Sequence, residues 1–359
     1  MPIQKKLICT LGPNSLNERV ISQLEAIGVR SFRINMSHTE IGELERVIHL
    51  IQSCTQVPIC LDTEGAQIRT GVMSHATTLR EGSTVRLVPE AASGNDSCIP
   101  LSPGFAIGGL VPGSSVSVDF DSVVLRIDTV SGGTAAATVV TSGEVGSHKA
   151  VTAFPSPNLP TFSEKDLLAI PCALQNQIHE FALSFCHDQS SVSQLRAMIG
   201  SEDTIIAKIE SRAGVRNLAE IARYADALLI DRGDLSREVR LEAIPLLQKA
   251  IIRKANALGI PVYVATNLLE SMVTRRTPSR AEVNDVINTL LDGANGLVLA
   301  AETAIGKYPV EAARMIMALL KEYEGSIEGY HLEDLLGEHP LDNHQTPRRE
   351  ASSPNGGTP

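Results

Sequence analysis

Short apolar runs alternate along most of this chain with longer stretches in which apolar residues recur at helical spacing. The short runs are continuous and rich in β-branched residues, which is typical of strands buried on both faces. They lie at residues 6–11, 31–36, 58–61, 180–185, 204–209, 227–230, 261–265 and 296–300. The helical stretches lie at residues 16–27, 42–53, 163–175, 191–199, 215–225, 241–258, 279–291 and 309–323. These eight pairs predict an α/β fold of the (β/α)8 (TIM) barrel type, with a doubly wound open sheet as the alternative.

One interval breaks this alternation after the third expected strand. Residues 72–155, called the insert below, show no helical period and contain alternating runs such as SVSVDF and VVLRIDTV. We predict a small antiparallel β-barrel there, inserted at the carboxyl end of a barrel strand, where it could act as a lid over a site. The main barrel would comprise residues 1–71 and 156–327, and the polar residues 328–359 are expected to be a disordered tail.

Polar and charged residues gather where the expected strands end. The carboxyl ends of parallel strands meet at one face of a barrel, and ligands bind at that face. The fifth expected strand ends in Lys208 and Glu210, and the sixth ends in Asp231, Arg232 and Asp234. An ammonium beside carboxylates suggests a divalent metal site that can hold an anionic oxygen substrate.

The other expected strands end in a similar way. Taken singly, each such residue could as well be a solvated loop residue or a helix cap, but the set keeps phase with the strands and therefore indicates a site. The further strand-end residues are Arg33, Asn35, Ser37, His38, Asp62, Thr63, Glu64, Arg69, Ser184, Thr266, Asn267, Glu302 and Thr303.

The composition of the chain and the absence of several motifs exclude some classes of function. The net charge of −10 argues against a general nucleic-acid binder. No apolar run reaches the roughly 18 residues of a membrane span, and the start of the chain has no small-residue cleavage site, so we expect a cytoplasmic protein. The six cysteines show no metal-ligand spacing, and the P-loop and dinucleotide-binding motifs are absent. Because His38 is the only histidine among the strand-end residues, hard oxygen ligands and Mg²⁺ or Mn²⁺ are favoured.

Motifs along the chain resemble those of the pyruvate kinase family. They are KKLICTLGP, FRINMSH, LDTEGAQIRTG, IIAKIES, IDRGDL, ATNLLESM, SRAEVNDV and AAETAIGKYP, in the family's order between residues 5 and 325. The resemblance implies phosphoryl transfer between phosphoenolpyruvate and ADP through a pyruvate enolate, with Mg²⁺ or Mn²⁺ and in many members K⁺. The family's carboxyl-terminal domain has no counterpart in these motifs, so we expect a homodimer or a monomer whose partners are these small molecules, without nucleic acid or membrane.

The resemblance also implies roles for individual residues. Glu210 and Asp234 match the divalent-metal ligands, and Lys208 matches the lysine that stabilises the phosphoryl group in transfer. Thr266 matches a catalytic threonine beside the enolate carbon. The substrate is implied to contact Ser184, Thr266 and the backbone of Arg232, Gly233 and Asp234. Nucleotide phosphates are implied to contact Arg33, which is also a catalytic candidate, Asn35, His38, Arg69 and Lys149. The implied K⁺ ligands are Asn35, Ser37, Asp62 and Thr63.

The sequence departs from the family pattern at several of these strand ends. The changes are Glu64 for Lys, Ala66 for Pro, Gln67 for Glu or Lys, Asp231 for a small residue, Asn267 for Gln, and Ala300 and Ala301 for a Ser-Gly pair. The lost serine belongs to the family's path for protonating the enolate, so we expect impaired or altered phosphotransfer and weak activation by K⁺. Two alternatives remain: a metal-dependent lyase or aldolase acting through a pyruvate-like enolate, and a non-catalytic paralogue that binds the same ligands.

Overall fold

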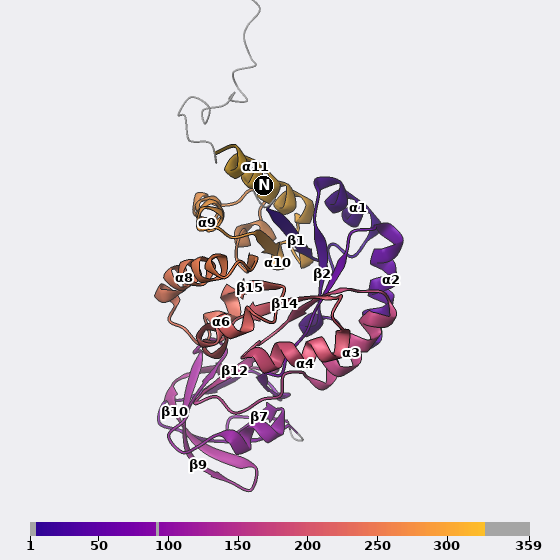
Figure 1. Cartoon of the computed structure of the whole chain (residues 1–359). Coiled ribbons are helices and arrows are strands. Elements are labelled where there is room, and N and C mark those ends of the chain that lie inside the picture. Colours follow the sequence, from indigo (N-terminus) through magenta and orange to yellow (C-terminus); the bar gives the residue numbers. More distant parts are fainter. Residues whose placement is uncertain (1–4, 91–92, 327–359) are drawn as a thin grey trace, which may run out of the picture.

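A computed structural model describes residues 5–90 and 93–326, and within them eight parallel strands close into a barrel (Figure 1). In the order in which they pair, the strands are β1 (Lys6–Thr10), β17 (Gly296–Leu299), β16 (Val262–Ala265), β15 (Ala227–Asp231), β14 (Thr204–Ile209), β13 (Glu180–Leu183), β3 (Ile59–Asp62) and β2 (Ser31–Asn35). Each predicted strand falls at one of these positions, so the predicted (β/α)8 barrel is confirmed and the open sheet was wrong. The tail expected at 328–359 lies outside the described residues.

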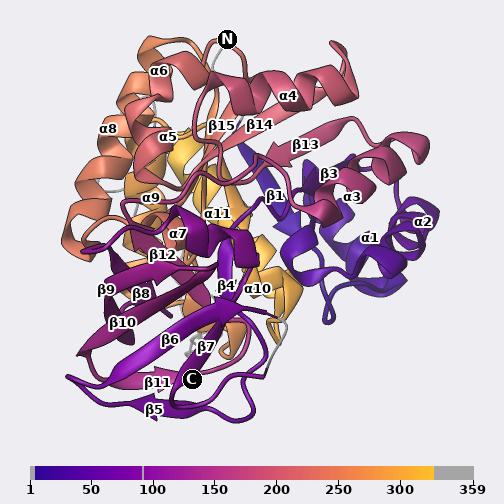
Figure 2. The same cartoon turned by 90° about the horizontal axis from the view of Figure 1, so that it is seen from below.

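Helices surround this barrel and follow the predicted stretches closely (Figures 1 and 2). They are α1 (Glu18–Ile27), α2 (Leu44–Cys54), α3 (Glu164–Gln175), α4 (Gln189–Ile199), α5 (Arg212–Arg216), α6 (Leu218–Ile221), α8 (Ile244–Ala257), α9 (Arg280–Leu291) and α11 (Pro309–Ser326). The stretch expected to form one helix at 215–225 forms two short ones, α5 and α6. They are separated at Asn217, whose side-chain amide donates a hydrogen bond to the carbonyl of His187.

Short helical turns at the strand ends shape the face where a site is expected. They are η1 (Met36–His38), η2 (Ile41–Glu43), α7 (Arg232–Leu235), η4 (Leu241–Ala243), η5 (Glu270–Val273) and α10 (Ala301–Ala304). Two of the longer helices begin with a capping box, at Ser163 for α3 and at Ser279 for α9. Reciprocal bonds of this kind satisfy backbone donors that a helix start leaves free and so define where the chain turns.

The apolar residues of the strands divide between two sides of the barrel wall. One large cluster, which includes Phe32, Leu61 and Phe181, fills the space between strands and helices. A smaller one, which includes Ile8, Ile206 and Val298, fills the barrel interior. Burial on both faces explains why the strands were visible as continuous apolar runs. Among the described residues, no helix is long and apolar enough to span a lipid bilayer.

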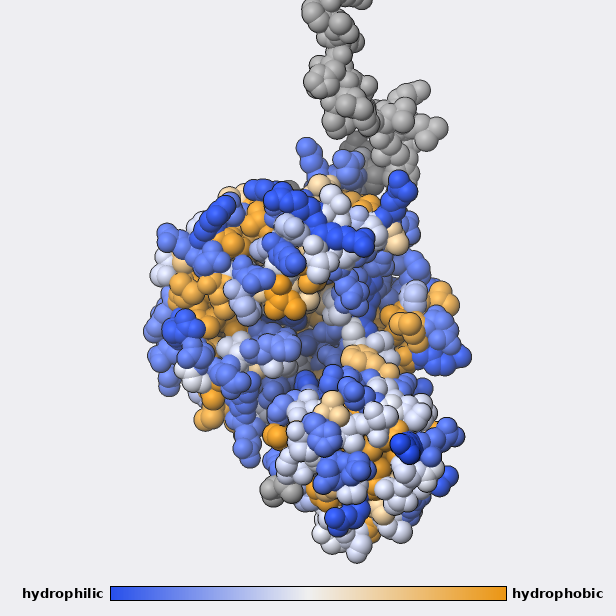
Figure 3. All heavy atoms as spheres, turned by 180° about the vertical axis from the view of Figure 1, so that it is seen from behind, coloured by the Kyte–Doolittle hydropathy of each residue, from blue (hydrophilic) through white to orange (hydrophobic). Residues whose placement is uncertain are grey.

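The insert forms a second closed barrel, which the figures show as a separate lobe below the first (Figures 1 and 3). Within the described part of the insert, its strands pair in the order β10 (Thr134–Thr141), β6 (Thr84–Pro89), β7 (Cys98–Ser102), β4 (Ile68–Thr70), β12 (Ala150–Phe154), β8 (Ser115–Val118) and β9 (Val123–Ser131). A separate ribbon pairs β5 (Thr77–Leu79) with β11 (Gly143–Val145), and η3 (Gly104–Gly109) adds a turn. The expected β-barrel is confirmed, although β6 and β7 pair in parallel, not antiparallel.

The connections place the insert beside the carboxyl end of β3. β4 follows that strand closely and pairs with β7 and β12, so the chain entering the insert and the chain leaving it lie together (Figure 2). β4 belongs to the barrel of the insert but lies before residue 72. The limits 72–155 therefore remain a proposal for where the insert begins and ends. A cleft runs between the two barrels, with Glu210, Asp234, Arg237 and Glu238 on one side and Val151, Thr152 and Ala153 on the other.

Candidate active site

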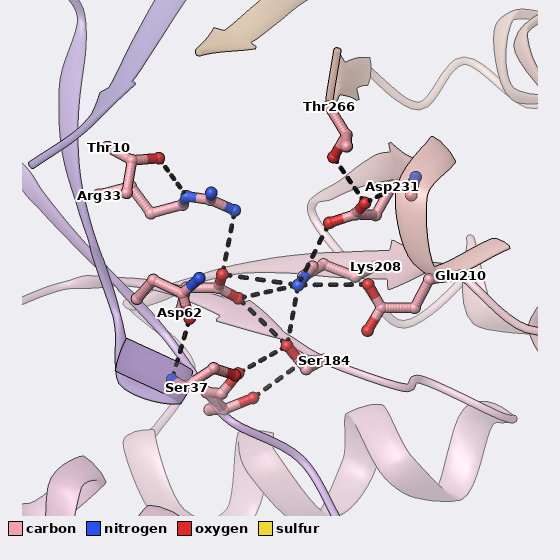
Figure 4. Close-up of polar contacts among 12 residues, drawn as sticks. Thr10, Arg33, Ser37, Asp62, Ser184, Lys208, Glu210, Asp231 and Thr266 are labelled. Atoms are coloured by element: carbon pink, nitrogen blue, oxygen red, sulfur yellow. Dashed lines mark hydrogen bonds and ion pairs between the residues drawn. The ribbon is translucent and has the colours of Figure 1, made fainter. Parts of the chain in front are cut away.

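The ammonium of Lys208 lies at the centre of the polar cluster at the barrel mouth (Figure 4). Its Nζ lies 3.0 Å from Ser184 Oγ, 3.2 Å from Glu210 Oε2, 3.4 Å from Asp62 Oδ1 and 3.7 Å from Asp231 Oδ2. All five side chains are buried and come from, or directly follow, neighbouring strands β3, β13, β14 and β15. These five residues from neighbouring strand ends therefore lie together, as predicted from the sequence.

The charges in this cluster set the protonation of Lys208. Burial alone would lower its pKa, but the surrounding carboxylates of Asp62, Glu210 and Asp231 outweigh burial and raise the pKa above its usual value. The ammonium is therefore permanently charged at physiological pH. A fixed positive charge in a dry pocket is suited to stabilising negative charge on a substrate oxygen.

Glu210 has one carboxylate oxygen that the protein does not satisfy. Its Oε1 accepts a hydrogen bond from the Phe185 backbone N–H at 2.6 Å, whereas its buried Oε2 accepts none from any described residue and only faces Lys208. Oxygen atoms of Glu210, Asp231 and Asp234 lie within 4.8 Å of one another. An unsatisfied buried oxygen beside two further carboxylates fits the hard, anionic donor set that Mg²⁺ or Mn²⁺ prefers.

The buried position of Glu210 predicts a pH-dependent stability for the metal-free protein. Burial raises the pKa of its carboxyl to about 8, against the opposing effect of the Lys208 ammonium. A carboxyl whose folded pKa exceeds its unfolded value stabilises the fold below the unfolded value, and this contribution is lost as the pH rises through the folded pKa. We therefore expect the melting temperature in EDTA to fall between pH 5 and 8, and to fall less in Glu210→Gln. Calorimetry of both proteins checks this, and parallel curves would contradict it.

Asp231, the residue that replaces a small one, is held tightly at the end of β15. Its Oδ1 accepts hydrogen bonds from Thr266 Oγ at 2.7 Å and from the Gly233 N–H at 3.2 Å. Burial would raise its pKa, but the Lys208 charge and the Thr266 hydroxyl lower it, so Asp231 is ionised. A Cβ on Gly233 would lie 2.8 Å from the Thr266 methyl, so only glycine lets this turn approach β16 so closely.

Thr266 itself has a strained backbone. Its φ is 77° and that of the following Asn267 is 56°, a left-handed conformation that is unfavourable for a β-branched residue. This turn directs the hydroxyl of Thr266 to Asp231. It also directs its carbonyl to Arg232, whose guanidinium donates to that oxygen and pairs with Asp285 at 2.7 Å. The side chain of Arg232 thus stabilises this turn.

Arg33 and Ser184 are held in place by hydrogen bonds and an ion pair within the cluster. Arg33 is buried, donates to Thr10 Oγ at 2.8 Å and pairs with Asp62 at 3.0 Å. The Ser184 hydroxyl donates to the Thr63 carbonyl at 2.6 Å, and the Thr63 hydroxyl accepts from the Ser184 N–H at 2.9 Å. Both side chains are therefore fixed before any substrate arrives.

The four residues implied to bind K⁺ come from two adjacent strand ends. Asn35 is the register partner of Asp62 in the pairing of β2 with β3, and Ser37 and Thr63 follow these residues. The Asn35 side chain accepts a hydrogen bond from the Ser37 N–H and so begins the turn η1. Their adjacency is compatible with one ion, and K⁺ binding stays a prediction.

The residues implied to contact the nucleotide are only partly brought together. Burial and the positive charges of Arg69, Arg33 and Lys165 lower the pKa of His38, so His38 faces the same positively charged part of the barrel mouth. Lys149 lies instead in the insert, where its ammonium pairs with Asp119 at 2.8 Å. Lys149 is therefore not part of the polar cluster around Lys208.

Three residues that the sequence motifs did not single out also support the site. Asp166 in α3 is buried and accepts hydrogen bonds from the N–H groups of Glu64 and Gly65 at 2.7 and 2.9 Å. Arg237 is 9% exposed, pairs with Asp234 at 2.9 Å and reaches Thr152 of the insert at 3.5 Å. Lys165 lies 4.0 Å from Glu64. Asp166 shows a sequence signal, since it is the third residue after Ser163 in a capping box.

Comparisons with known proteins indicate the family of this chain. A family model described as "Pyruvate kinase, barrel domain" matches residues 3–313. Pyruvate kinase of Geobacillus stearothermophilus is 35% identical, with 91% of this chain and 58% of that enzyme covered. Pyruvate kinase of Thermococcus litoralis is 34% identical, with 90% and 71% covered. Plastidial pyruvate kinase 2 of Arabidopsis thaliana is 30% identical, with 93% and 59% covered. This chain thus spans 58% of the length of the first of these relatives.

Proposed function

This chain belongs to the pyruvate kinase family, and on that premise we propose that it is a phosphotransferase that moves a phosphoryl group between phosphoenolpyruvate and ADP. The observation that carries the proposal is the buried Lys208 ammonium, held among Ser184, Glu210, Asp62 and Asp231 at the barrel mouth. Phosphoryl transfer depends mainly on positioning and charge stabilisation, and a fixed buried cation offers both.

Individual side chains of this protein would have separate roles in the reaction. Lys208 stabilises charge on the moving phosphoryl group and on the enolate oxygen, because it remains protonated and is held away from water. Arg33, already fixed by Thr10 and Asp62, presents a second positive charge at the same mouth. His38 is exposed and Arg69 is half-buried, so both could receive nucleotide phosphates from solvent. The insert, linked to the barrel through Arg237 and Thr152, would cover the cleft as a lid.

Glu210 and Asp234 would hold a divalent metal ion. The unsatisfied Glu210 Oε2 is the structural reason for this assignment, and Asp234 lines the same cleft. When bound, Mg²⁺ or Mn²⁺ supplies charge neutralisation and orients anionic oxygens of the substrate. The binding of K⁺ by Asn35, Ser37, Asp62 and Thr63 is a further part of the proposal.

The proton path to the enolate is the step that this chain would perform poorly. Ala300 follows β17 and donates its backbone N–H to Glu302 Oε2 at 2.9 Å. Its methyl side chain offers no hydroxyl for relaying a proton, so protonation of the enolate carbon would depend on water or on Thr266. We therefore expect phosphoryl transfer to proceed and the complete reaction to be slow.

A coupled assay of ATP formation from phosphoenolpyruvate and ADP tests this proposal. We expect a low but metal-dependent rate in the wild type, and a higher rate in Ala300→Ser because a hydroxyl is restored at the strand end. Calorimetric titration with ADP should show binding to both proteins. If neither protein binds ADP or forms ATP, the phosphotransferase proposal is wrong.

A metal-dependent lyase acting through a pyruvate-like enolate is the second candidate. The observation that favours it is Asp231, an extra carboxylate that accepts hydrogen bonds from Thr266 and the Gly233 backbone beside Lys208. In a lyase, Lys208 would still be essential, whereas Arg33 and Arg69 would have no nucleotide to bind. Release of pyruvate from a 2-oxo acid without any response to ADP would favour this candidate.

A further inference from the structure

We propose that Asp231 is a third protein ligand of the divalent metal, in addition to Glu210 and Asp234. The inference rests on the metal site of the proposed function and deepens it. A site with three carboxylates would hold the metal through the protein itself, without needing a substrate oxygen to complete a minimal donor set.

The two oxygens of Asp231 have different surroundings. Oδ1 is fully engaged by the Thr266 hydroxyl and the Gly233 N–H, which fix the orientation of the carboxylate. Oδ2 faces the Lys208 ammonium at 3.7 Å, which is too long for a hydrogen bond, and the Asp234 backbone N–H also helps to hold the carboxylate in its ionised form. Oδ1 therefore anchors the carboxylate, and Oδ2 keeps lone pairs that can coordinate an ion. Metal ligands are typically oriented by outer hydrogen bonds of this kind.

An independent observation indicates that an ion belongs at this point. The Oε2 atom of Glu210, a residue only 1% exposed, accepts no hydrogen bond from any described residue. Glu210 also offers one carboxylate oxygen to the group in which oxygens of Glu210, Asp231 and Asp234 lie within 4.8 Å of one another. A buried carboxylate oxygen without a hydrogen bond is costly unless a cation binds it.

The charges around Lys208 support the same conclusion. Arg33 pairs with Asp62, and Arg237 pairs with Asp234. Of the described residues in this cluster, Glu210 and Asp231 then share the single ammonium of Lys208. With both carboxyls ionised, as metal binding requires, the cluster would carry an excess of negative charge. A divalent cation would reverse this excess and leave the site attractive to an anionic substrate.

The simpler role for Asp231 is that of a counter-ion to Lys208 alone. Asp62 offers the comparison, because its carboxylate lies at a similar distance from the ammonium, 3.4 Å, but is not one of the three clustered oxygens. If Asp231 acts only through its charge, removing either carboxylate should weaken metal binding to the same extent. If Asp231 is a ligand, its removal should have the larger effect.

The experiment is a titration of the full chain with Mn²⁺, with free Mn²⁺ measured by electron paramagnetic resonance and without any substrate. We expect Asp231→Asn to weaken Mn²⁺ binding by about tenfold or more, and Asp62→Asn to weaken it clearly less. Glu238→Gln removes a carboxylate from the same cleft outside the three-oxygen group and should bind Mn²⁺ like the wild type. Unchanged binding by Asp231→Asn, or equal losses in Asp231→Asn and Asp62→Asn, would overturn the proposal.

Two further variants keep the result decisive. If Asp231→Asn does not fold, Thr266→Val removes only the hydroxyl that fixes Oδ1. It should weaken Mn²⁺ binding severalfold, and wild-type affinity there would contradict the proposal. Measuring Mn²⁺ binding by Glu210→Gln distinguishes the existence of the metal site from the role of Asp231 in it. Lost binding in Glu210→Gln with unchanged binding in Asp231→Asn would refute the third ligand alone, whereas unchanged binding in Glu210→Gln would refute the metal site itself.

Discussion

The Lys208→Met variant is expected to lose phosphoryl transfer by about a thousandfold in kcat/KM, because one preorganised cation facing developing charge contributes that order of rate enhancement. Among the described lysines and arginines, Lys208 alone has hydrogen bonds or ion pairs within 4 Å to Ser184, Glu210, Asp62 and Asp231 together. Methionine has a similar length and no charge. The loss should therefore appear in kcat with a smaller change in the KM for phosphoenolpyruvate.

The same substitution should destabilise the metal-free protein. Removing one partner of a buried ion pair leaves uncompensated charge and costs about 3–5 kcal/mol. Adding Mn²⁺ should restore part of this stability, since a cation again balances Glu210 and Asp231. Lys249→Met is the matched control, because Lys249 pairs with Asp292 away from the barrel mouth. Rates measured with a coupled assay and melting temperatures measured by calorimetry check both effects, and substantial turnover in Lys208→Met would show that another group stabilises the transferred phosphoryl.

Replacing Glu210 by Gln has the second largest expected effect, which is the loss of metal-dependent activity. An amide oxygen is a poor substitute for an anionic ligand of Mg²⁺ or Mn²⁺, so we expect activity to fall by about a hundredfold or more at ordinary metal concentrations. The fold should survive, because glutamine can still accept the hydrogen bond from the Phe185 N–H.

Metal titrations of the rate distinguish a ligand from a structural residue. The activity of Glu210→Gln should recover only at much higher Mn²⁺, if at all, whereas the control Glu238→Gln should follow the wild-type curve. Glu238 lines the same cleft and accepts a hydrogen bond from the Arg212 N–H. Wild-type metal dependence in Glu210→Gln would remove Glu210 from the metal site.

The barrel could be predicted from sequence because its strands are buried on both faces and its helices on one. Continuous apolar runs at Thr204–Ile209 and Ala227–Asp231 show this burial directly. Convergence of their polar ends follows from topology alone, since parallel strands end on the same face. This is why the sequence predicts that Lys208, Glu210 and Asp231 meet.

The details within the site could not be predicted in the same way. The direction of the Asp231 carboxylate depends on the left-handed backbone at Thr266, which apolar periodicity does not encode. The side chain of Arg232 turns toward Asp285 in α9, a contact between residues far apart in the sequence. The ion pair of Lys149 with Asp119 likewise depends on how the strands of the insert fold together. Each of these contacts depends on tertiary packing, which the local pattern of apolar and polar residues does not determine.

We propose that the Lys208 cluster supports metal-dependent phosphoryl transfer to a nucleotide. The most direct measurement is phosphorus NMR of phosphoenolpyruvate and ADP with substrate-level amounts of the full chain, with and without Mg²⁺. We predict that phosphoenolpyruvate is consumed and the γ-phosphate resonance of ATP appears only when Mg²⁺ is present, and that neither occurs with Lys208→Met. Phosphoenolpyruvate and ADP that persist unchanged beside folded, Mg²⁺-loaded wild-type protein would contradict the claim.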